Sequence, residues 1–147
     1  MKNIQLVLKL NLILFLLSST FSFAQNQDID VPFVVLEDIP QFDNCEITSG
    51  KEAKDCFFQM MNNHIISNFR YPKQAVKKNI QGRVTVLFVI DKNGDITNIK
   101  THAPEGCQLL EIEAVRIIKL LPKFKPAIQR GEAVGVSYAQ PINFKLN

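Results

Sequence analysis

The chain has few of the residues from which metal and catalytic sites are built. Among its 147 residues there are two histidines, His64 and His102, and neither has a cysteine or an acidic residue at a metal-ligand spacing. We therefore expect no metal site and a structural role for both rings. The sequence also lacks a glycine-rich phosphate loop, a nucleophile elbow and a convincing Ser/His/Asp set. These absences predict a protein that is not an enzyme and needs no cofactor.

One pair of carboxylates does not change that expectation. Glu111 and Glu113 lie two residues apart on a predicted helix, so their side chains point to different faces. They cannot converge on one substrate atom, as acid–base catalysis requires. We expect both to be surface charges.

Near its start the chain has an apolar run that is short for a membrane span. Leu10–Leu17 falls well below the roughly 20 apolar residues that cross hydrocarbon, and Lys9 and Asn11 interrupt the run. Basic residues before it and small residues after it are typical of a secretory signal peptide. We expect residues 1–24 to be removed after Ala24 and the protein to be periplasmic, with an uncleaved inner-membrane anchor as the alternative. Lipidation is not expected, because the residue after the cleavage site is not a cysteine.

The remainder, residues 25–147, has the size of one domain and contains no internal repeat or low-complexity tract. Its charge is divided unevenly, since residues 25–69 are acidic and residues 70–147 are basic. The basic residues are scattered without interleaved aromatic side chains, so no nucleic-acid site is predicted. We expect a solvated surface that favours acidic protein partners, and contact with membranes only through such partners.

Three cysteines are present, and an exported protein meets an oxidising compartment in which cysteines pair. Cys45 and Cys56 lie on either side of Gly50, a natural bend, and are the expected disulfide. The short loop that it closes would contribute about 2–3 kcal/mol to stability. Cys107 is then unpaired. Nothing near it in the sequence supplies a general base, so we expect a buried thiol rather than a reactive one.

A lead-in and a long helix are predicted before residue 70. Residues 25–50 carry acids and prolines without sustained periodicity and are expected to be an acidic, partly ordered lead-in. Ser49 and Glu52 fit a capping box. A helix over Lys51–Asn68 follows, because its apolar residues recur at three-or-four spacing. The folded domain is expected over residues 51–147, with this helix as an N-terminal extension.

The middle of the domain is predicted to be a short helix followed by a β-hairpin. Pro72–Asn79 begins with a proline, which the first turn of a helix tolerates. Arg83–Ile90 is rich in β-branched residues and is the strongest strand signal in the chain. Asp91–Gly94 supplies a tight turn, since Asn and Gly tolerate positive φ. Asp95–His102 is the expected returning strand.

A second long helix and a final strand complete the prediction. Gln108–Leu121 carries an apolar stripe that is expected to pack on the hairpin, and Pro122 ends it. Arg130–Glu132 turns the chain. From Val134 to Leu146 apolar residues alternate with small or polar ones, as in a strand with one buried face. Pro141 cannot donate a ladder hydrogen bond, so this strand is expected at an edge of the sheet.

Seven segments of the chain carry a family likeness through their order and spacing. They are Tyr71–Ala75, Ile80–Val84, Phe88–Gly94, Glu113–Arg116, Leu121–Ala127, Gly131–Val134 and Pro141–Phe144. Together they resemble the C-terminal domain of TonB energy transducers over residues 64–147, and the chain also resembles envelope proteins of the Bacteroidetes type.

This resemblance implies a fold and a mode of binding. The fold would be α+β, a small three-stranded antiparallel sheet with helices packed on one face. In that family the last strand receives the short TonB-box peptide of outer-membrane receptors by strand addition, in which backbone hydrogen bonds give affinity and side-chain pockets give selection. Carried over to this sequence, the partner-binding residues are Val134, Gly135, Val136, Ser137, Tyr138, Ala139, Gln140, Pro141, Ile142, Asn143 and Phe144.

The sequence departs from a transducer at its front, where the family has a membrane helix and a long proline-rich segment. Force transmission from an inner-membrane motor is therefore not implied. The leading hypothesis is a periplasmic TonB-like module that binds outer-membrane receptors in energy-coupled transport. The alternative is an envelope structural or assembly protein that uses the same edge strand to form a homodimer or to pair with other envelope components.

The exported protein is expected to begin at Gln25, because the short and interrupted apolar run cannot hold the chain in a membrane. N-terminal sequencing of the protein recovered from the periplasm measures this directly. A product that begins at Met1 and fractionates with the inner membrane would show that residues 1–24 are an anchor instead.

Overall fold

The computed structural model describes residues 31–32, 36–47 and 49–146, and the expected signal peptide lies outside them. None of the helices in this part of the chain is long and apolar enough to span a membrane. The elements are β1 (Val31–Pro32), α2 (Gly50–Asn68), α3 (Lys73–Lys77), β2 (Gly82–Ile90), β3 (Ile96–His102), α4 (Gln108–Lys119), β4 (Ala127–Gln129), β5 (Glu132–Val134) and β6 (Val136–Phe144).

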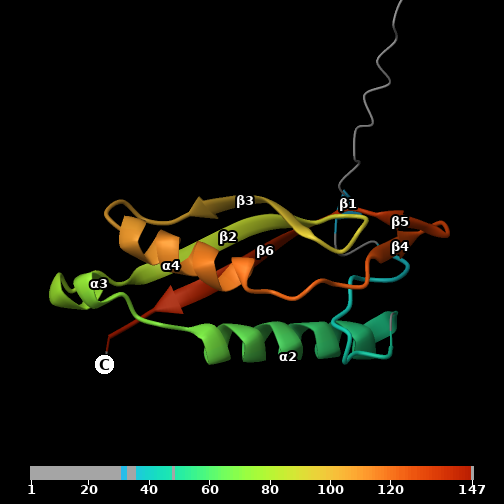
Figure 1. The fold of residues 1–147 in the computed structure, drawn as a ribbon, viewed down its shortest axis with the longest axis horizontal. Coiled ribbons are helices and arrows are strands. Elements are labelled where there is room, and N and C mark those ends of the chain that lie inside the picture. Colours follow the sequence, from blue (N-terminus) through green and yellow to red (C-terminus); the bar gives the residue numbers. More distant parts are fainter. Residues whose placement is uncertain (1–30, 33–35, 48, 147) are drawn as a thin grey trace, which may run out of the picture.

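Three long antiparallel strands form the centre of the fold (Figure 1). β2 lies between β3 and β6, and it pairs with β6 from Gly82 opposite Phe144 to Ile90 opposite Val136. The two-residue strand β1 adds to the outer side of β6 in parallel orientation. A separate small sheet joins β4 to β5. The expected α+β fold with a three-stranded antiparallel sheet is confirmed, with β1 as an addition that the sequence did not indicate.

Both long helices cover the same face of this sheet. Alternate residues of β2, among them Val84, Val86 and Phe88, are buried in one core with the apolar side of α4. α2 lies beside β6 (Figure 1), where the rings of Phe57 and Tyr138 meet with centroids 5.3 Å apart. The core therefore fills the space between the sheet and the two helices.

The turn between β2 and β3 forms as its sequence predicts. The carboxylate of Asp91 accepts hydrogen bonds from the N–H groups of Asn93 and Asp95, at 2.8 and 2.9 Å. Gly94 adopts a φ of 83°. It also packs against the backbone of Phe124, whose N–H donates to the Gly94 carbonyl at 2.9 Å. The hairpin is thereby attached to the segment that follows α4.

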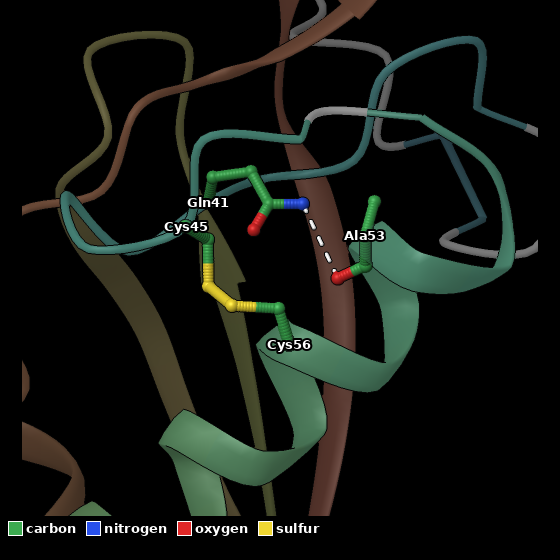
Figure 2. Close-up of a disulfide and its surroundings, with 4 residues drawn as sticks. All are labelled: Gln41, Cys45, Ala53 and Cys56. Atoms are coloured by element: carbon green, nitrogen blue, oxygen red, sulfur yellow. Dashed lines mark hydrogen bonds between the residues drawn. A yellow bond between two sulfur atoms is a disulfide. The ribbon is translucent and has the colours of Figure 1, made fainter.

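The predicted disulfide between Cys45 and Cys56 is present and ties the lead-in to α2 (Figure 2). The two Cα atoms are 6.1 Å apart. Beside the disulfide, the fully buried Gln41 donates from Nε2 to the carbonyl of Ala53 at 3.4 Å. Its backbone exchanges two hydrogen bonds with Lys125. Covalent and backbone contacts thus hold this part of the lead-in on the domain.

The described part of the lead-in contributes side chains to the core. Ile39, Phe42 and Cys45 are buried in the same cluster as the residues of the sheet and the helices. Asp38 exchanges backbone hydrogen bonds with Ile128, at 3.0 and 3.1 Å. Single bridges and isolated buried residues have no period, which explains why the sequence showed no element there.

Two local predictions are wrong. The predicted last strand is divided, because Val134 pairs with Ala127 in the small sheet and β6 begins only at Val136. Ser49 is the N-cap residue of α2 but makes no side-chain capping hydrogen bond, so the capping box does not form. Gly50, the first residue of α2, has a φ of 81° and turns the backbone after Ser49.

Gly94→Ala is expected to destabilise the fold strongly. A Cβ atom there would lie 1.8 Å from the carbonyl oxygen of Phe124, on a backbone that is already left-handed. The backbone conformation costs about 1–2 kcal/mol and the overpacking about as much again, so the free energy of unfolding in urea should fall by about 3 kcal/mol. Gly131→Ala is the matched control, since Gly131 has a φ of 76° and open space around its Cβ position among the described residues. Equal losses in the two variants would contradict the Phe124 contact.

Candidate peptide-binding edge

The residues predicted to bind a partner do not all lie on one strand. Val136 to Phe144 form β6, whereas Val134 belongs to β5 and Gly135 lies between the two strands. These two residues therefore offer no backbone groups along the edge of the main sheet. The candidate site is the outer edge of β6.

Side chains of β6 alternate between the two faces of the sheet. Tyr138 is half-buried on the helix side, and burial raises the pKa of its hydroxyl to about 12. The other residues on that side are buried, namely Val136, Gln140, Ile142 and Phe144. The residues on the opposite face are exposed, namely Ser137, Ala139, Pro141 and Asn143. A strand added beside β6 would continue this alternation.

Pro141 shows which backbone groups of β6 face outward. In an antiparallel ladder, successive residues direct their N–H and C=O groups to one neighbour and then to the other. Pro141 lies opposite Thr85 of β2 and has no N–H, so it fits without loss where its backbone points away from β2. Its carbonyl accepts a hydrogen bond from Nε2 of Gln140 at 3.0 Å. Ala139 and Asn143 lie two residues away on either side, so their backbone N–H and C=O groups also point away from β2.

Part of this edge is already paired within the chain. β1 aligns Val31 with Val136 and Pro32 with Ser137. A substitution at Ser137 would therefore disturb the β1 contact and would not report on a partner. Further along, the outer side of β6 from Ala139 onward has no strand partner in the part of the chain that the structure describes.

A groove of about 420 Å³ lies between this open stretch and α2. Residues 140–143 of β6 form one side of it. The other side comes from the C-terminal half of α2 and the residue after it, and we call it the α2 wall: Asn62, Ile65, Ile66 and Phe69. Three of these four side chains are apolar, and residue Ile66 is 74% exposed. The open edge therefore faces an apolar surface.

Polar contacts hold the C-terminal end of α2 against α4. Glu113 accepts hydrogen bonds from the N–H of Arg70 at 3.0 Å and from the guanidinium of Arg116 at 2.6 and 2.8 Å. Arg116 also donates to the carbonyl of Asn68 at 2.6 Å. The hydrogen bond from Arg116 is the main cause that lowers the pKa of Glu113. We call this set of contacts the Glu113 clamp.

The Glu113 clamp corrects one prediction from the sequence. Glu113 was expected to be a surface charge, but its side chain is 11% exposed. The α4 helix turns it toward the connection that follows α2, where it meets backbone groups distant in sequence. Glu111, two residues away, is half-buried and takes no part in this clamp.

The remaining candidate residues have structural positions. Nε2 of His64 lies 2.9 Å from the carbonyl oxygen of Ile117, as expected for a hydrogen-bonded structural histidine. Cys107 is unpaired and buried, with Sγ 3.8 Å from the carbonyl oxygen of Gln81. Within the described ranges, no group of three or more His, Cys, Asp and Glu side chains is placed to hold a metal ion.

Sequence reasoning missed the α2 wall, the β1 contact and the role of Gln140. One signal was available for the wall, because Ile66 stands next to Ile65 and outside the apolar stripe of its helix. An apolar residue on the otherwise solvent-exposed face of a helix indicates a second contact surface. No comparable signal existed for Gln140, whose contact with Pro141 depends on the local path of β6.

A three-stranded antiparallel sheet with a partly open edge beside a helix defines a small α+β domain. The family described as Gram-negative bacterial TonB protein C-terminal matches residues 67–146, more than half of the chain, and the chain belongs to this family. α2 ends at Asn68, so almost all of it precedes the matched region.

Two relatives and two solved structures illustrate the similarity. The chain is 27% identical over 78 residues to the proteins named Protein TonB from strains B100 and ATCC 33913 of Xanthomonas campestris pv. campestris. The match covers 53% of this chain and 34% of each relative, so the chain spans about a third of their length. Two NMR solution structures of the Helicobacter pylori TonB C-terminal domain are 28% identical, with a TM-score of 0.42. They cover 62% and 67% of this chain, and the matches span 83% and 100% of those chains.

Glu113→Gln is expected to weaken the clamp in a pH-dependent manner. The folded protein holds the pKa of Glu113 below its ordinary value of 4.5. The carboxylate therefore stabilises the fold above that pH, and the contribution is lost as the pH falls through the folded pKa. At neutral pH we expect the variant to lose about 1–2 kcal/mol of unfolding free energy, measured in denaturant, and to converge with the parent in acid. Glu111→Gln is the control on the same helix. A loss that stayed constant with pH would contradict an ionised clamp.

Proposed function

We propose that this protein is a periplasmic TonB-like module that engages outer-membrane TonB-dependent receptors by β-strand addition, in energy-coupled transport across the outer membrane. Family membership supports the class of partner. The outward-facing backbone at Pro141 and the open stretch beyond Ser137 support the mode of binding. The bound segment is a receptor peptide of the TonB-box kind, extended along β6.

The observation that carries this proposal is the contact between Gln140 and Pro141. The side-chain amide donates to the outward carbonyl, at the place where the backbone N–H of an added strand would donate. An unpaired edge carbonyl beside an apolar groove is costly, and the side-chain amide of Gln140 satisfies it. The edge is therefore built to be hydrogen-bonded by an amide, which every peptide backbone supplies.

Asn143→Pro is expected to weaken peptide capture and to leave the sheet intact. The N–H of Asn143 faces outward like the backbone of Pro141, so proline removes a donor that the partner uses and none that β2 uses. For a synthetic peptide carrying a receptor TonB box, we expect the Kd of the mature protein to rise by about 5- to 10-fold, which corresponds to about 1–1.4 kcal/mol. Isothermal titration calorimetry measures this change. Asn143→Ala keeps the N–H and is the matched control.

Circular dichroism and thermal melting establish that both variants are folded. Full affinity in folded Asn143→Pro would exclude strand addition at this position. A parent protein that ignores every receptor peptide and self-associates in sedimentation would favour the envelope structural or assembly role, in which two copies pair through β6.

A further inference from the structure

We propose that the α2 wall makes the β6 edge selective for extended peptides that carry apolar side chains at two alternate positions, those paired with Gln140 and Ile142. This inference rests on the proposed strand addition. It adds the kind of side chain that the partner peptide must carry. It also assigns the selection of that peptide to α2, a helix that lies almost wholly before the region matched by the family.

The alternation of β6 decides which peptide side chains meet the wall. Residues paired across two neighbouring strands point to the same face of a sheet. Gln140 and Ile142 are buried on the helix side, whereas Pro141 is exposed on the opposite face. Peptide residues paired with Gln140 and Ile142 therefore point toward the α2 wall. The peptide residue paired with Pro141 points to solvent.

The chemistry of the wall determines what those two side chains must be. Ile65, Ile66 and Phe69 present hydrocarbon to the groove, and Ile66 retains most of its surface for a partner to cover. An apolar side chain removes this surface and its own from water. A charged side chain would lose its water without gaining a partner of opposite sign, because the groove is lined by no charged residue among those described.

The occupant of the groove is an extended segment because only such a segment satisfies the backbone of the edge. The outward groups at Ala139, Pro141 and Asn143 repeat every second residue, which matches the spacing of a β-strand and not that of a helix. The same edge already carries one extended segment, since β1 pairs with Val136 and Ser137. An added peptide therefore pairs with β6 from Ala139 onward, and only the short stretch up to Phe144 is available to it.

The wall is held in place before a partner arrives. Near its N-terminal end, α2 is bonded to the lead-in through Cys56, and at its C-terminal end Asn68 accepts a hydrogen bond from Arg116. His64 adds a contact to the carbonyl of Ile117 between these two points. A helix anchored along its length loses little freedom on binding, so its contacts can contribute to selection.

A charge placed on the wall tests the inference. Ile66→Glu should raise the Kd of the receptor peptide by about 10-fold or more, because the carboxylate would be desolvated beside the apolar peptide side chains. Ile112→Glu is the matched control, since Ile112 is 68% exposed on α4 and lies outside the groove. That variant should bind as the parent does. Both isoleucines are exposed, so both variants are expected to fold.

Substitutions in the peptide supply the second measurement. Each peptide residue is replaced in turn by lysine, and the Kd is measured with the parent and with Ile66→Glu. We expect two sensitive positions, two residues apart, in the parent. At one or both of them, the lysine peptide should bind Ile66→Glu at least about 5-fold more tightly than it binds the parent, because the carboxylate then has an opposite charge beside it.

The outcomes separate this inference from the proposed function. Loss of binding in Asn143→Pro, together with full affinity in Ile66→Glu and no two-residue period in the peptide, would overturn the selective wall and leave strand addition standing. A parent that binds no receptor peptide at all would overturn both. Equal loss in Ile66→Glu and Ile112→Glu would show a general charge effect and would also overturn the wall.

Discussion

The pairing of β2 with β6 is the constraint on which the rest of the structure depends. It places β2 at the centre of the sheet and leaves β3 and β6 with one outer side each. It also sets the phase of β6, because Val84 lies opposite Ile142 and Gly82 opposite Phe144. A shift of one residue would turn every side chain of β6 to the other face. Phe144 would then be exposed and Asn143 buried. The residues of β6 that now point to solvent would point toward the helices instead.

An exposed edge strand is a liability in a folded domain, since it can pair with any other chain. This protein limits the exposure of β6 in three ways. β1 covers Val136 and Ser137, the amide of Gln140 satisfies the outward carbonyl of Pro141, and α2 lies along the side of the remaining stretch. If a partner strand adds at the stretch that remains open, as proposed, protection against wrong partners and selection of the right one would use the same residues.

Predictions from the sequence were accurate where the signal is local. The β-branched run of β2, the Asp91–Gly94 turn and the apolar stripes of α2 and α4 each depend on neighbours within a few residues, and each was found. Pro141 also indicated an edge, because its missing N–H limits its position in any sheet. The errors arose where distant residues decide. Val134 joins the small sheet because Ala127 lies opposite it, and Glu113 is covered because the end of α2 reaches it. The α2 wall likewise depends on how α2 packs beside β6. Its only sign in the sequence is Ile66, an apolar residue outside the apolar stripe of its helix.

The long separation between the two central strands has a kinetic consequence. β2 ends at Ile90 and β6 begins at Val136, so a third of the chain must be available before the central ladder can form. Closing so large a loop is slow compared with forming the β2–β3 hairpin. Until then the hairpin has neither its partner strand nor the β6 side chains that complete its core. The central ladder can therefore be completed only when Phe144 is available to pair with Gly82, so the last strand of the domain decides when folding is complete.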